Sequence, residues 1–444
     1  MYKYGLTGMP LGHSMSKIIH EEILKIKNID GKYSLLETDN LDKSFWEVLT
    51  NLDGFNVTIP YKKDIIKYLD VCSDEVKLYN VCNTVKILDN VKTGYNTDVY
   101  GFNDTLLKNS VNLKGKKVLV LGNGGVSTLI VLEAVLQGAD VYISGRNKEK
   151  IYELIDFVFL KTGVKPKYIK KEDIDYFDVM INGTSLGMYP NVFESFIPLE
   201  KLKNISVVFD VIYNPYKTLM LRVAEYYGNK GISGLNMLVA QAVKAQEIFN
   251  NITLSKDEFL KVLNKAKENI PPFKVDKNII LIGAPASGKT SISREIAKIL
   301  NMQFIDIDQL IAEKEGMTIN EIFENKKEAY FREKEREVFL ESIKNKGRVI
   351  STGGGLAEYF NLNSINKEEN IIVYIDVNKD ILFNRIKGDT TRPLLKDDKN
   401  KLFEIIKRRH PVYKECCSLS QKVEKEENIK DTTVKIIDKI ILRI

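Results

Sequence analysis

Residues 283–290 read GAPASGKT, and their types and spacing fit nucleotide chemistry. This stretch follows the apolar run 279–282 and satisfies G-x-x-x-x-G-K-[ST], a pattern whose backbone N–H groups cradle phosphates at the start of a helix. Lys289 would contact the β- and γ-phosphates, and Thr290 would bind Mg²⁺. The stretch predicts a site for ATP and Mg²⁺ but does not identify the phosphate acceptor. The predicted nucleotide-binding residues are Gly283, Gly288, Lys289 and Thr290.

A second glycine-rich turn, GNGGVS at 122–127, lies in the first half of the chain. It follows the apolar run 118–121 and precedes a helical stretch and a second strand-like run at 139–144. This order aims backbone N–H groups and a helix N-terminus at a pyrophosphate, which is typical of a dinucleotide-binding domain. The predicted cofactor-binding residues are Gly122, Asn123, Gly124 and Gly125.

The end of that second strand indicates which dinucleotide binds. It reads ISGRN, with Arg146 present and no carboxylate nearby. An acidic residue would accept hydrogen bonds from the ribose hydroxyls of NAD, whereas a guanidinium suits the 2′-phosphate of NADP in charge and geometry. We therefore predict NADP(H), the alternative being a surface arginine with no ligand.

Three polar segments among the apolar runs predict a pocket that faces this cofactor: FNVTIPYKK (55–63), NTV (83–85) and YNTDVYG (95–101). Polar side chains at strand ends gather in such a pocket. Lys62 and Asp98 have the chemistry for acid–base work on a carbonyl or a hydroxyl. Taken singly, Lys62 would be a solvated lysine at a helix start, and only its grouping with the other polar residues favours a functional role.

The stretch FIDID (304–308) places two carboxylates just after a strand-like run. Residues two apart on a strand share one face, so we expect Asp306 and Asp308 to point the same way. Beside an ATP site, one carboxylate would support Mg²⁺ and the other the attacking hydroxyl.

Arginines recur around the same predicted site. AYFREKE (329–335) places Arg332 and Glu335 one helical turn apart. Each arginine alone would be a surface salt bridge, but several on separate motifs favour an anionic acceptor. The other motifs are the glycine turn STGGGLAE (351–358), TRPLL (391–395) and RRHPVY (408–413).

The elements that position these residues follow an α/β order. Strand-like runs at 3–8, 32–37 and 54–59 alternate with helical patterns near 15–27, 42–51 and 62–69, which predicts a parallel α/β arrangement. A second α/β unit starts at 116, and the helical pattern at 234–266 would fold back onto the first. The two prolines in ENIPPFKVDKN (268–278) indicate a linker before a third unit.

Composition excludes several classes of protein. With 444 residues, 44% hydrophobic and 28% charged, the chain is typical of a soluble protein with two or three domains. The net charge of +6 is spread out with no long basic block, so we expect no nucleic-acid partner. No apolar run approaches 18 residues, so we expect no membrane span and a cytoplasmic location. The four cysteines show no C-x-x-C pair, so reduced thiols are expected.

The first 265 residues resemble the shikimate dehydrogenase family. The motifs that carry the resemblance are GMPLGHSMSKIIH (8–20), GFNVTIPYK (54–62), CNT (82–84), NTDVYG (96–101), GNGGVS (122–127), INGTSLGM (181–188), DVIYNPYKT (210–218) and GLNMLVAQA (234–242). The resemblance implies that NADPH passes a hydride to the carbonyl of 3-dehydroshikimate, with Lys62 and Asp98 as the catalytic pair. It implies that Ser14 and Ser16 bind the substrate carboxylate. The residues implied to line the substrate ring are Thr58, Asn83, Tyr213 and Gln241.

Two positions depart from the family pattern. Lys17 stands where the family usually has proline, although both serines of that loop are kept. The turn that binds the adenosine side of NADP usually reads Asn-Arg-Thr, and here Gly145-Arg146-Asn147 keeps only the arginine. This leaves the strictness of the NADP preference open.

Residues 278–444 resemble the shikimate kinase family. The resemblance implies that Asp308 binds the ring hydroxyls and orients or deprotonates the attacking one, and that Asp306 acts around Mg²⁺. Glu335 would hold Arg332, and Arg392 would lie in a lid that closes over the phosphates. The residues implied to bind the substrate are Arg332 and Arg409, at its carboxylate, and Gly353, Gly354 and Gly355, beside its ring.

The sequence as a whole predicts a bifunctional enzyme that makes shikimate and then phosphorylates its 3-hydroxyl. We expect a substrate-binding domain at 1–103 with 236–267 folding back, a Rossmann NADP domain at 104–235, a linker at 268–277 and a P-loop kinase domain at 278–444. Alternatives are quinate at the first site, a gluconate-type acceptor at the second, or a regulatory protein with degenerate sites. The oligomeric state and any channelling of shikimate stay open.

Overall fold

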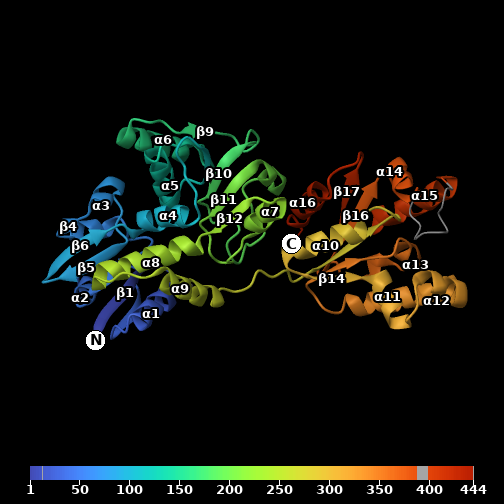
Figure 1. Cartoon of the computed structure of the whole chain (residues 1–444), viewed down its shortest axis with the longest axis horizontal. Helices are drawn as coiled ribbons and strands as arrows, with labels where there is room; N and C mark the ends of the chain where they lie inside the picture. The colour runs from blue at the N-terminus through green and yellow to red at the C-terminus, as the bar shows by residue number, and fades with distance from the viewer. Residues whose placement is uncertain (13, 388–398, 444) are drawn as a thin grey trace. The chain divides into compact units, whose positions relative to one another are not determined.

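The computed structural model describes residues 1–12, 14–387 and 399–443 (Figure 1). The chain divides into two compact units. The first contains Met1–Val192 and Lys203–Pro272, and the second contains Phe193–Leu202 and Phe273–Ile444. The division after Pro272 lies inside the segment for which the two prolines indicate a linker. The short 3₁₀ helix η2 (Leu199–Asn204) lies where the chain passes between the units.

The first sheet, in the first unit, has the strand order β2-β1-β3-β5-β6-β4. Its β1, β2 and β3 are parallel, as expected, but β5 is antiparallel to both β3 and β6. The parallel arrangement predicted for these three strands is confirmed, and the antiparallel β5 was not predicted. The reason for the antiparallel pairing of β5 with β6 is local: Asp89 and Asn90 both take positive φ (50° and 64°), as a two-residue hairpin turn requires. The strands are β1 (Tyr2–Gly8), β2 (Gly31–Glu37), β3 (Gly54–Val57), β4 (Val71–Cys72), β5 (Thr84–Leu88) and β6 (Val91–Tyr95).

Helices from two distant stretches of sequence cover this sheet. The helical pattern at 234–266 is two helices, because Asn251 ends the first in the left-handed region at φ 52°. The stretch near 62–69 forms a 3₁₀ helix rather than an α-helix. A Cβ on Gly101 would lie 2.7 Å from the Met237 carbonyl oxygen, so this glycine lets α4 and α8 pack closely. The elements are α1 (Ser16–Ile26), α2 (Lys43–Thr50), η1 (Asp64–Tyr68), α3 (Asp74–Tyr79), α4 (Thr97–Lys108), α8 (Leu235–Asn250) and α9 (Lys256–Glu268).

The second sheet, also in the first unit, is parallel throughout, in the order β12-β11-β10-β7-β8-β9. This is the doubly wound arrangement: successive strands are added in one direction from β7 to β9, and then in the opposite direction from β10 to β12. A ligand site is expected outside the carboxyl ends of β7 and β10. The elements are β7 (Lys117–Leu121), α5 (Gly125–Leu136), β8 (Asp140–Ser144), α6 (Lys148–Thr162), β9 (Lys167–Tyr168), β10 (Phe177–Asn182), β11 (Ile205–Asp210), α7 (Leu219–Tyr227) and β12 (Lys230–Ser233).

The third sheet, in the second unit, is parallel in the order β14-β15-β13-β16-β17. Its central strand β13 is completely buried and leads into the glycine-rich loop. Helix α12 is broken at Lys327, whose φ of 72° and ψ of 165° are not helical. The elements are β13 (Asn278–Gly283), α10 (Lys289–Leu300), β14 (Gln303–Asp306), α11 (Ile307–Glu315), α12 (Ile319–Ser342), β15 (Arg348–Ser351), α13 (Leu356–Tyr359), η3 (Leu362–Ser364), β16 (Asn370–Val377), α14 (Lys379–Ile386), α15 (Lys399–Cys416), β17 (Leu419–Val423) and α16 (Ile429–Ile440).

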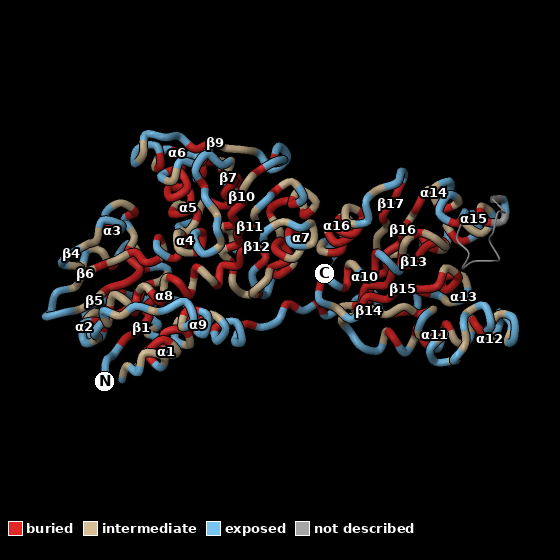
Figure 2. Tube along the Cα trace, viewed as in Figure 1, coloured by how far each residue is buried: buried red, intermediate tan, exposed pale blue. Residues whose placement is uncertain are grey.

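Burial follows the strands in each unit, as the red segments of Figure 2 show. The central strands β7 and β13 are near-continuous runs of Val, Leu and Ile, because strands covered by helices on both faces need apolar side chains on both. All four cysteines are free thiols. Among the residues that the structure describes, no helix is both long enough and apolar enough to cross a membrane.

The buried His20 predicts how the stability of the first unit responds to pH. His20 is 1% exposed, and burial lowers its pKa from 6.5 to about 3. Below pH 6.5 the unfolded chain therefore binds a proton that the folded chain does not. The free energy of unfolding should fall as the pH drops from 6.5 towards 3, by up to about 1.4 kcal/mol per pH unit from this group.

A His20→Gln variant should lose that part of the pH dependence. Trp46, the single tryptophan of the chain, lies in the first unit, so its fluorescence in urea titrations at pH 7, 6 and 5 reports the relevant unfolding. Equal slopes of unfolding free energy against pH in the variant and the wild type would contradict the prediction.

Candidate active sites

A cavity of about 350 Å³ opens in the first unit. Residues from widely separated parts of the sequence line it, and these include every residue predicted to bind or act on the first substrate. They are Ser14, Ser16, Thr58, Lys62, Asn83, Asp98, Tyr213 and Gln241.

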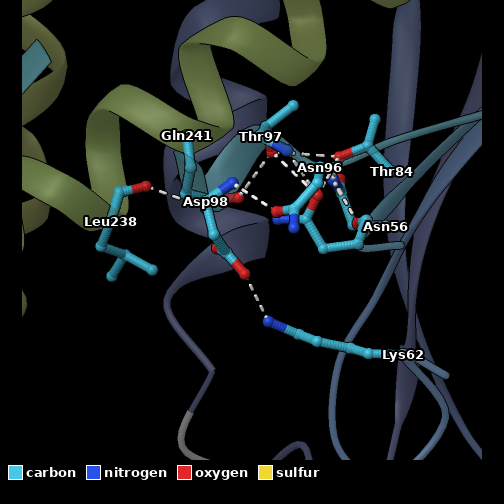
Figure 3. A network of polar contacts seen from close by, with 9 residues as sticks. Asn56, Lys62, Thr84, Asn96, Thr97, Asp98, Leu238 and Gln241 are labelled. Carbon is cyan, nitrogen blue, oxygen red and sulfur yellow. Dashed lines mark hydrogen bonds and ion pairs between the residues drawn. The ribbon is translucent and has the colours of Figure 1, made fainter. Parts of the chain in front are cut away.

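Lys62 and Asp98 form an ion pair in this cavity, with 2.6 Å between the Lys62 Nζ and the Asp98 Oδ2. Figure 3 shows the two side chains pointing toward one another from separate segments. Lys62 lies in the turn between β3 and η1, and Asp98 in the first turn of α4, where the Asn96 side chain caps the helix. The two side chains are 24% and 17% exposed, so a ligand in the cavity can reach both. An ammonium held by a carboxylate can donate a proton to a ligand oxygen.

Ser14 and Ser16 lie at the start of α1. The Ser14 hydroxyl accepts a hydrogen bond from the Ser16 backbone N–H, at 3.3 Å. The first backbone N–H groups of a helix have no partner within it and carry partial positive charge. Two hydroxyl donors beside such a helix start suit an anionic ligand group, such as a carboxylate.

Asp210, which the sequence reasoning missed, holds the loop that carries Tyr213. It lies at the end of β11, fully buried, and accepts hydrogen bonds from the Thr218 hydroxyl (2.6 Å), the Asn182 amide (2.9 Å) and the Ile212 N–H (3.1 Å). Burial raises the pKa of Asp210 to about 6, against the lowering effect of these donors. The sequence signal was an acidic residue inside an apolar strand.

The glycine turn at 122–125 follows β7, at the point where the order of strands in the second sheet reverses between β7 and β10. Gly122 has φ +103°, and a Cβ there would lie 2.9 Å from the Ser127 hydroxyl and 3.0 Å from the Thr184 methyl group. Glycine is therefore required by both conformation and space. Gly124 caps α5 and Gly125 begins it, so the N–H groups of this helix face the space above the turn. The Asn123 amide donates to the Asn147 carbonyl, at 3.5 Å. These features fit a dinucleotide phosphate.

Arg146 lies just beyond β8, at the predicted adenosine end of this site. It is exposed, and it makes no hydrogen bond or ion pair with another residue that the structure describes. A guanidinium without a protein partner keeps its donors for a ligand phosphate. The arrangement fits NADP(H).

The second unit carries the phosphate loop between β13 and α10. Gly283 and Gly288 have φ +153° and +88°, conformations that other residues rarely adopt. The buried Lys289 curls over the loop and donates to the Gly283 and Ala284 carbonyls, both at 3.0 Å. Loop N–H groups, a lysine and the start of α10 together fit the phosphates of ATP. Arg385, another residue that the sequence reasoning missed, donates to the Ala286 carbonyl of the same loop, at 3.3 Å.

Asp306 and Asp308 do not share a strand face, so that expectation is wrong. β14 ends at Asp306, which caps α11 by accepting from the Gln309 N–H, and Asp308 lies in the first helical turn. The side chain of Asp306 instead accepts a hydrogen bond from the Thr290 hydroxyl, at 2.9 Å. A hydroxyl and a carboxylate beside a phosphate loop are oxygen ligands that suit Mg²⁺.

The glycine segment 353–355 lies against the remaining predicted residues. A Cβ on Gly353 would lie 2.8 Å from the Asp308 Oδ1 and closer still to the Glu335 Oε1. Gly354 lies against Pro285 of the phosphate loop, and a Cβ on Gly355 would collide with the Arg332 guanidinium. The structure therefore brings Asp308, Arg332, Glu335 and the three glycines together beside the phosphate loop.

The two arginines of this cluster are held by carboxylates. Arg332 donates to the Glu335 carboxylate at 2.7 Å, and burial raises the pKa of Glu335. Arg409 donates to the Gly354 carbonyl and to the Glu358 carboxylate, both at 2.8 Å. The sequence reasoning missed Glu358, whose only signal was a carboxylate three residues after the glycine turn. Arg392, predicted to lie in a lid, falls outside the described residues.

Comparison with known proteins identifies both halves of the chain. Residues 6–85 match the model of the shikimate dehydrogenase substrate binding domain, and residues 285–442 match the model of shikimate kinase. The shikimate dehydrogenase (NADP(+)) of Caldicellulosiruptor bescii is 39% identical over 280 residues, which are 61% of this chain and 96% of that protein. This chain belongs to the shikimate dehydrogenase family. It continues into a shikimate kinase domain, and both predicted resemblances are confirmed.

Solved structures agree over the dehydrogenase half. The chorismate mutase/shikimate 5-dehydrogenase fusion protein from Clostridium acetobutylicum is 34% identical, with a TM-score of 0.55 over 61% of this chain and 98% of that one. The shikimate 5-dehydrogenase from Thermus thermophilus, solved with NADP(H) and shikimate, is 25% identical, with a TM-score of 0.54 over 60% of this chain and all of that one. The predicted α/β fold class is confirmed. The chain is a bifunctional shikimate-pathway enzyme that uses NADP and ATP.

The Arg146 guanidinium, which has no protein partner in the part of the chain that the structure describes, generates a prediction about cofactor preference. Arg146→Ala should raise the KM for NADPH about tenfold or more, because a charge-assisted hydrogen bond to the 2′-phosphate is lost. The KM for NADH, which lacks that phosphate, should change less than twofold. Lys161→Ala removes a cation at the far end of α6, the helix that begins two residues after Arg146, and should change neither value. Equal changes for NADPH and NADH would contradict the prediction.

The close approach at Gly353 generates a prediction about the kinase. Gly353→Ala places a Cβ against the carboxylates of Asp308 and Glu335, which must move, and a small misplacement of catalytic groups can cost about 100-fold. Kinase kcat/KM should fall by about that factor, while the dehydrogenase activity of the same chain, which reports the amount of intact enzyme, should stay unchanged. A variant with wild-type kinase activity would show that Asp308 and Glu335 need not lie where they do.

Proposed function

We propose that the first unit reduces 3-dehydroshikimate to shikimate with NADPH and that the second unit phosphorylates the shikimate 3-hydroxyl with ATP. The observation that carries this proposal is the presence of two complete polar sites in one chain. One is the cavity with the Lys62–Asp98 pair, and the other is the phosphate loop beside Asp308, Arg332 and Arg409. The product of the first reaction is the substrate of the second, so the two assignments support each other.

In the first site, bound NADPH would supply the hydride. Ser14 and Ser16 bind the substrate carboxylate at the start of α1, while Thr58, Asn83, Tyr213 and Gln241 surround the ring. Lys62 donates a proton to the oxygen that gains charge as the carbonyl is reduced, and Asp98 holds the ammonium and a ring hydroxyl in place. Gly122, Asn123, Gly124, Gly125 and Arg146 hold the dinucleotide.

In the second site, bound ATP with Mg²⁺ would supply the phosphoryl group. Asp308 orients the attacking hydroxyl and accepts its proton, and Arg332 and Arg409 bind the carboxylate of the acceptor. Lys289 stabilises charge on the phosphates, and Thr290 with Asp306 holds the metal ion. Glu335 keeps Arg332 in position through their 2.7 Å contact. The same proposal includes a cytoplasmic location. It also includes a substrate-binding domain at 1–103 with 236–267, a Rossmann domain at 104–235, a linker at 268–277 and a kinase domain at 278–444.

A coupled reaction tests the whole proposal. The purified chain receives 3-dehydroshikimate, NADPH, ATP and Mg²⁺, and shikimate 3-phosphate is measured. Omitting ATP should stop the sequence at shikimate, and omitting NADPH should stop it at 3-dehydroshikimate. Quinate serves as the competing substrate for the first site. A kcat/KM for quinate that exceeds the value for shikimate would overturn the substrate assignment.

Two substitutions should separate the two activities. Lys62→Ala should lower the dehydrogenase kcat by about 10²-fold or more, because a positioned acid–base group contributes about that factor, and should leave the kinase unchanged. Lys289→Ala should do the reverse, because it removes a cation that stabilises the transferred phosphate. Each activity is measured separately, with its own substrate supplied. Loss of both activities in one folded variant would contradict independent sites.

A further inference from the structure

We propose that Tyr33, which does not line the cavity, is a positioning residue that acts through Asn56 to hold Asn83 and Thr84 in place for the substrate of the first site. The inference rests on the proposed function of that site, because it concerns how the cavity binds a hydroxylated ring. It follows from the direction of each hydrogen bond in a buried chain of polar side chains, part of which Figure 3 shows.

The chain begins at Tyr33 on β2. Tyr33 is completely buried, and its ring stacks on His20 with 4.1 Å between the ring centroids. Its hydroxyl donates to the Asn56 Oδ1, at 2.8 Å. Asn56 lies on β3 and does line the cavity. The Tyr33 hydroxyl therefore reaches the wall of the cavity from behind.

The orientation of the Asn56 amide is set by its other partners. Its Nδ2 donates to the Thr84 hydroxyl at 2.9 Å and to the Asn83 backbone carbonyl at 3.3 Å. A backbone carbonyl can only accept a hydrogen bond, so the Nδ2 must face it and the Oδ1 must face Tyr33. Tyr33 thus supplies the one donor that the buried Asn56 oxygen has among the described residues.

The orientation of the Asn83 amide is set in the same way. Its Oδ1 accepts from the Thr97 backbone N–H at 2.8 Å, and the hydroxyls of Thr84 and Thr97 lie 3.1 and 3.2 Å away. A backbone N–H can only donate, so the Asn83 oxygen is committed to the protein. The Asn83 Nδ2 donates to no residue within the described ranges and is left for a ligand. At this position the cavity therefore selects a ligand oxygen that accepts a hydrogen bond.

Removal of the Tyr33 hydroxyl would leave the Asn56 oxygen buried without a donor, which is costly. Asn56 would then turn or shift to find another donor and would release the Asn83 carbonyl and the Thr84 hydroxyl that it now holds. The expected loss is in binding of the ring rather than in binding of the dinucleotide, because this chain of contacts does not include the glycine turn at 122–125.

Tyr4 provides a matched control. It is the register partner of Tyr33 on the neighbouring strand, is 1% exposed, and also donates its hydroxyl to an asparagine Oδ1, that of Asn250, at 2.6 Å. The contacts beyond Asn250 lead through Gln246 to His20, not to a residue that lines the cavity. Tyr4→Phe and Tyr33→Phe therefore remove the same group from equally buried sites.

The experiment compares Tyr33→Phe and Tyr4→Phe in the full chain by steady-state kinetics. Tyr33→Phe should raise the KM for 3-dehydroshikimate about tenfold, and the KM for NADPH and the kinase activity should change less than twofold. Tyr4→Phe should change all three less than twofold. Equal effects of the two variants, or an unchanged KM for 3-dehydroshikimate in Tyr33→Phe, would overturn the inference.

A second comparison separates positioning from general loosening of the sheet. In an Asn56→Ala background, Tyr33→Phe should cause no further rise in the KM for 3-dehydroshikimate, because Tyr33 acts through Asn56. The same tenfold rise in both backgrounds would overturn the inference. A wild-type chain that fails to reduce 3-dehydroshikimate would instead refute the proposed function, and the inference with it.

Discussion

The ion pair between Lys62 and Asp98 requires two separate segments of the chain to hold the Lys62 Nζ 2.6 Å from the Asp98 Oδ2. Asp98 can be there only because α4 is held against α8, and the two helices approach closely only because Gly101 has no side chain. Helix α8 begins at Leu235, after the whole second sheet. The dinucleotide domain is therefore an insertion, and the substrate cavity is completed by a helix that follows it. The cavity is therefore built from both domains, since Tyr213 reaches it from the loop after β11 and Gln241 reaches it from α8.

The second unit also has to bring charged groups from distant segments close together. It does so around a segment of three glycines, where the acidic and basic side chains occupy the space that other side chains would fill. Glu335 is 1% exposed, and its Oε2 accepts from Arg332. The Arg332 guanidinium offsets part of the cost of burying this carboxylate. Glu358 plays the corresponding part for Arg409, so each arginine is already oriented before a ligand arrives. Such orientation reduces the entropy lost on binding.

The sequence was most informative where a local pattern has a single chemical use. The phosphate loop and the turn at 122–125 could be read from motifs, because the spacing of each reflects one turn. The pairing of Lys62 with Asp98 came from the grouping of polar strand ends and from the resemblance to a family. The hairpin at Asp89-Asn90 had a readable signal that was missed, and Asp308 was assigned to a strand because the capping role of Asp306 was overlooked. Tyr33, Asp210 and Glu358 could not be found this way. The Tyr33 hydroxyl and the Glu358 carboxylate meet partners 23 and 51 residues away in sequence. Asp210 is buried beside Asn182 of the neighbouring strand as well as beside nearby residues, so all three roles follow from packing.

The two sites, in their proposed roles, would hold the same carboxylate in different ways. The first uses neutral hydroxyls of Ser14 and Ser16 beside a helix start, and the second uses the guanidinium groups of Arg332 and Arg409. A guanidinium brings a full positive charge and two parallel N–H donors to a carboxylate, whereas a serine hydroxyl brings one neutral donor. The product of the first reaction would therefore leave a site that holds its carboxylate less strongly and enter one that holds it more strongly. That difference favours flow from reduction to phosphorylation without any requirement for direct transfer.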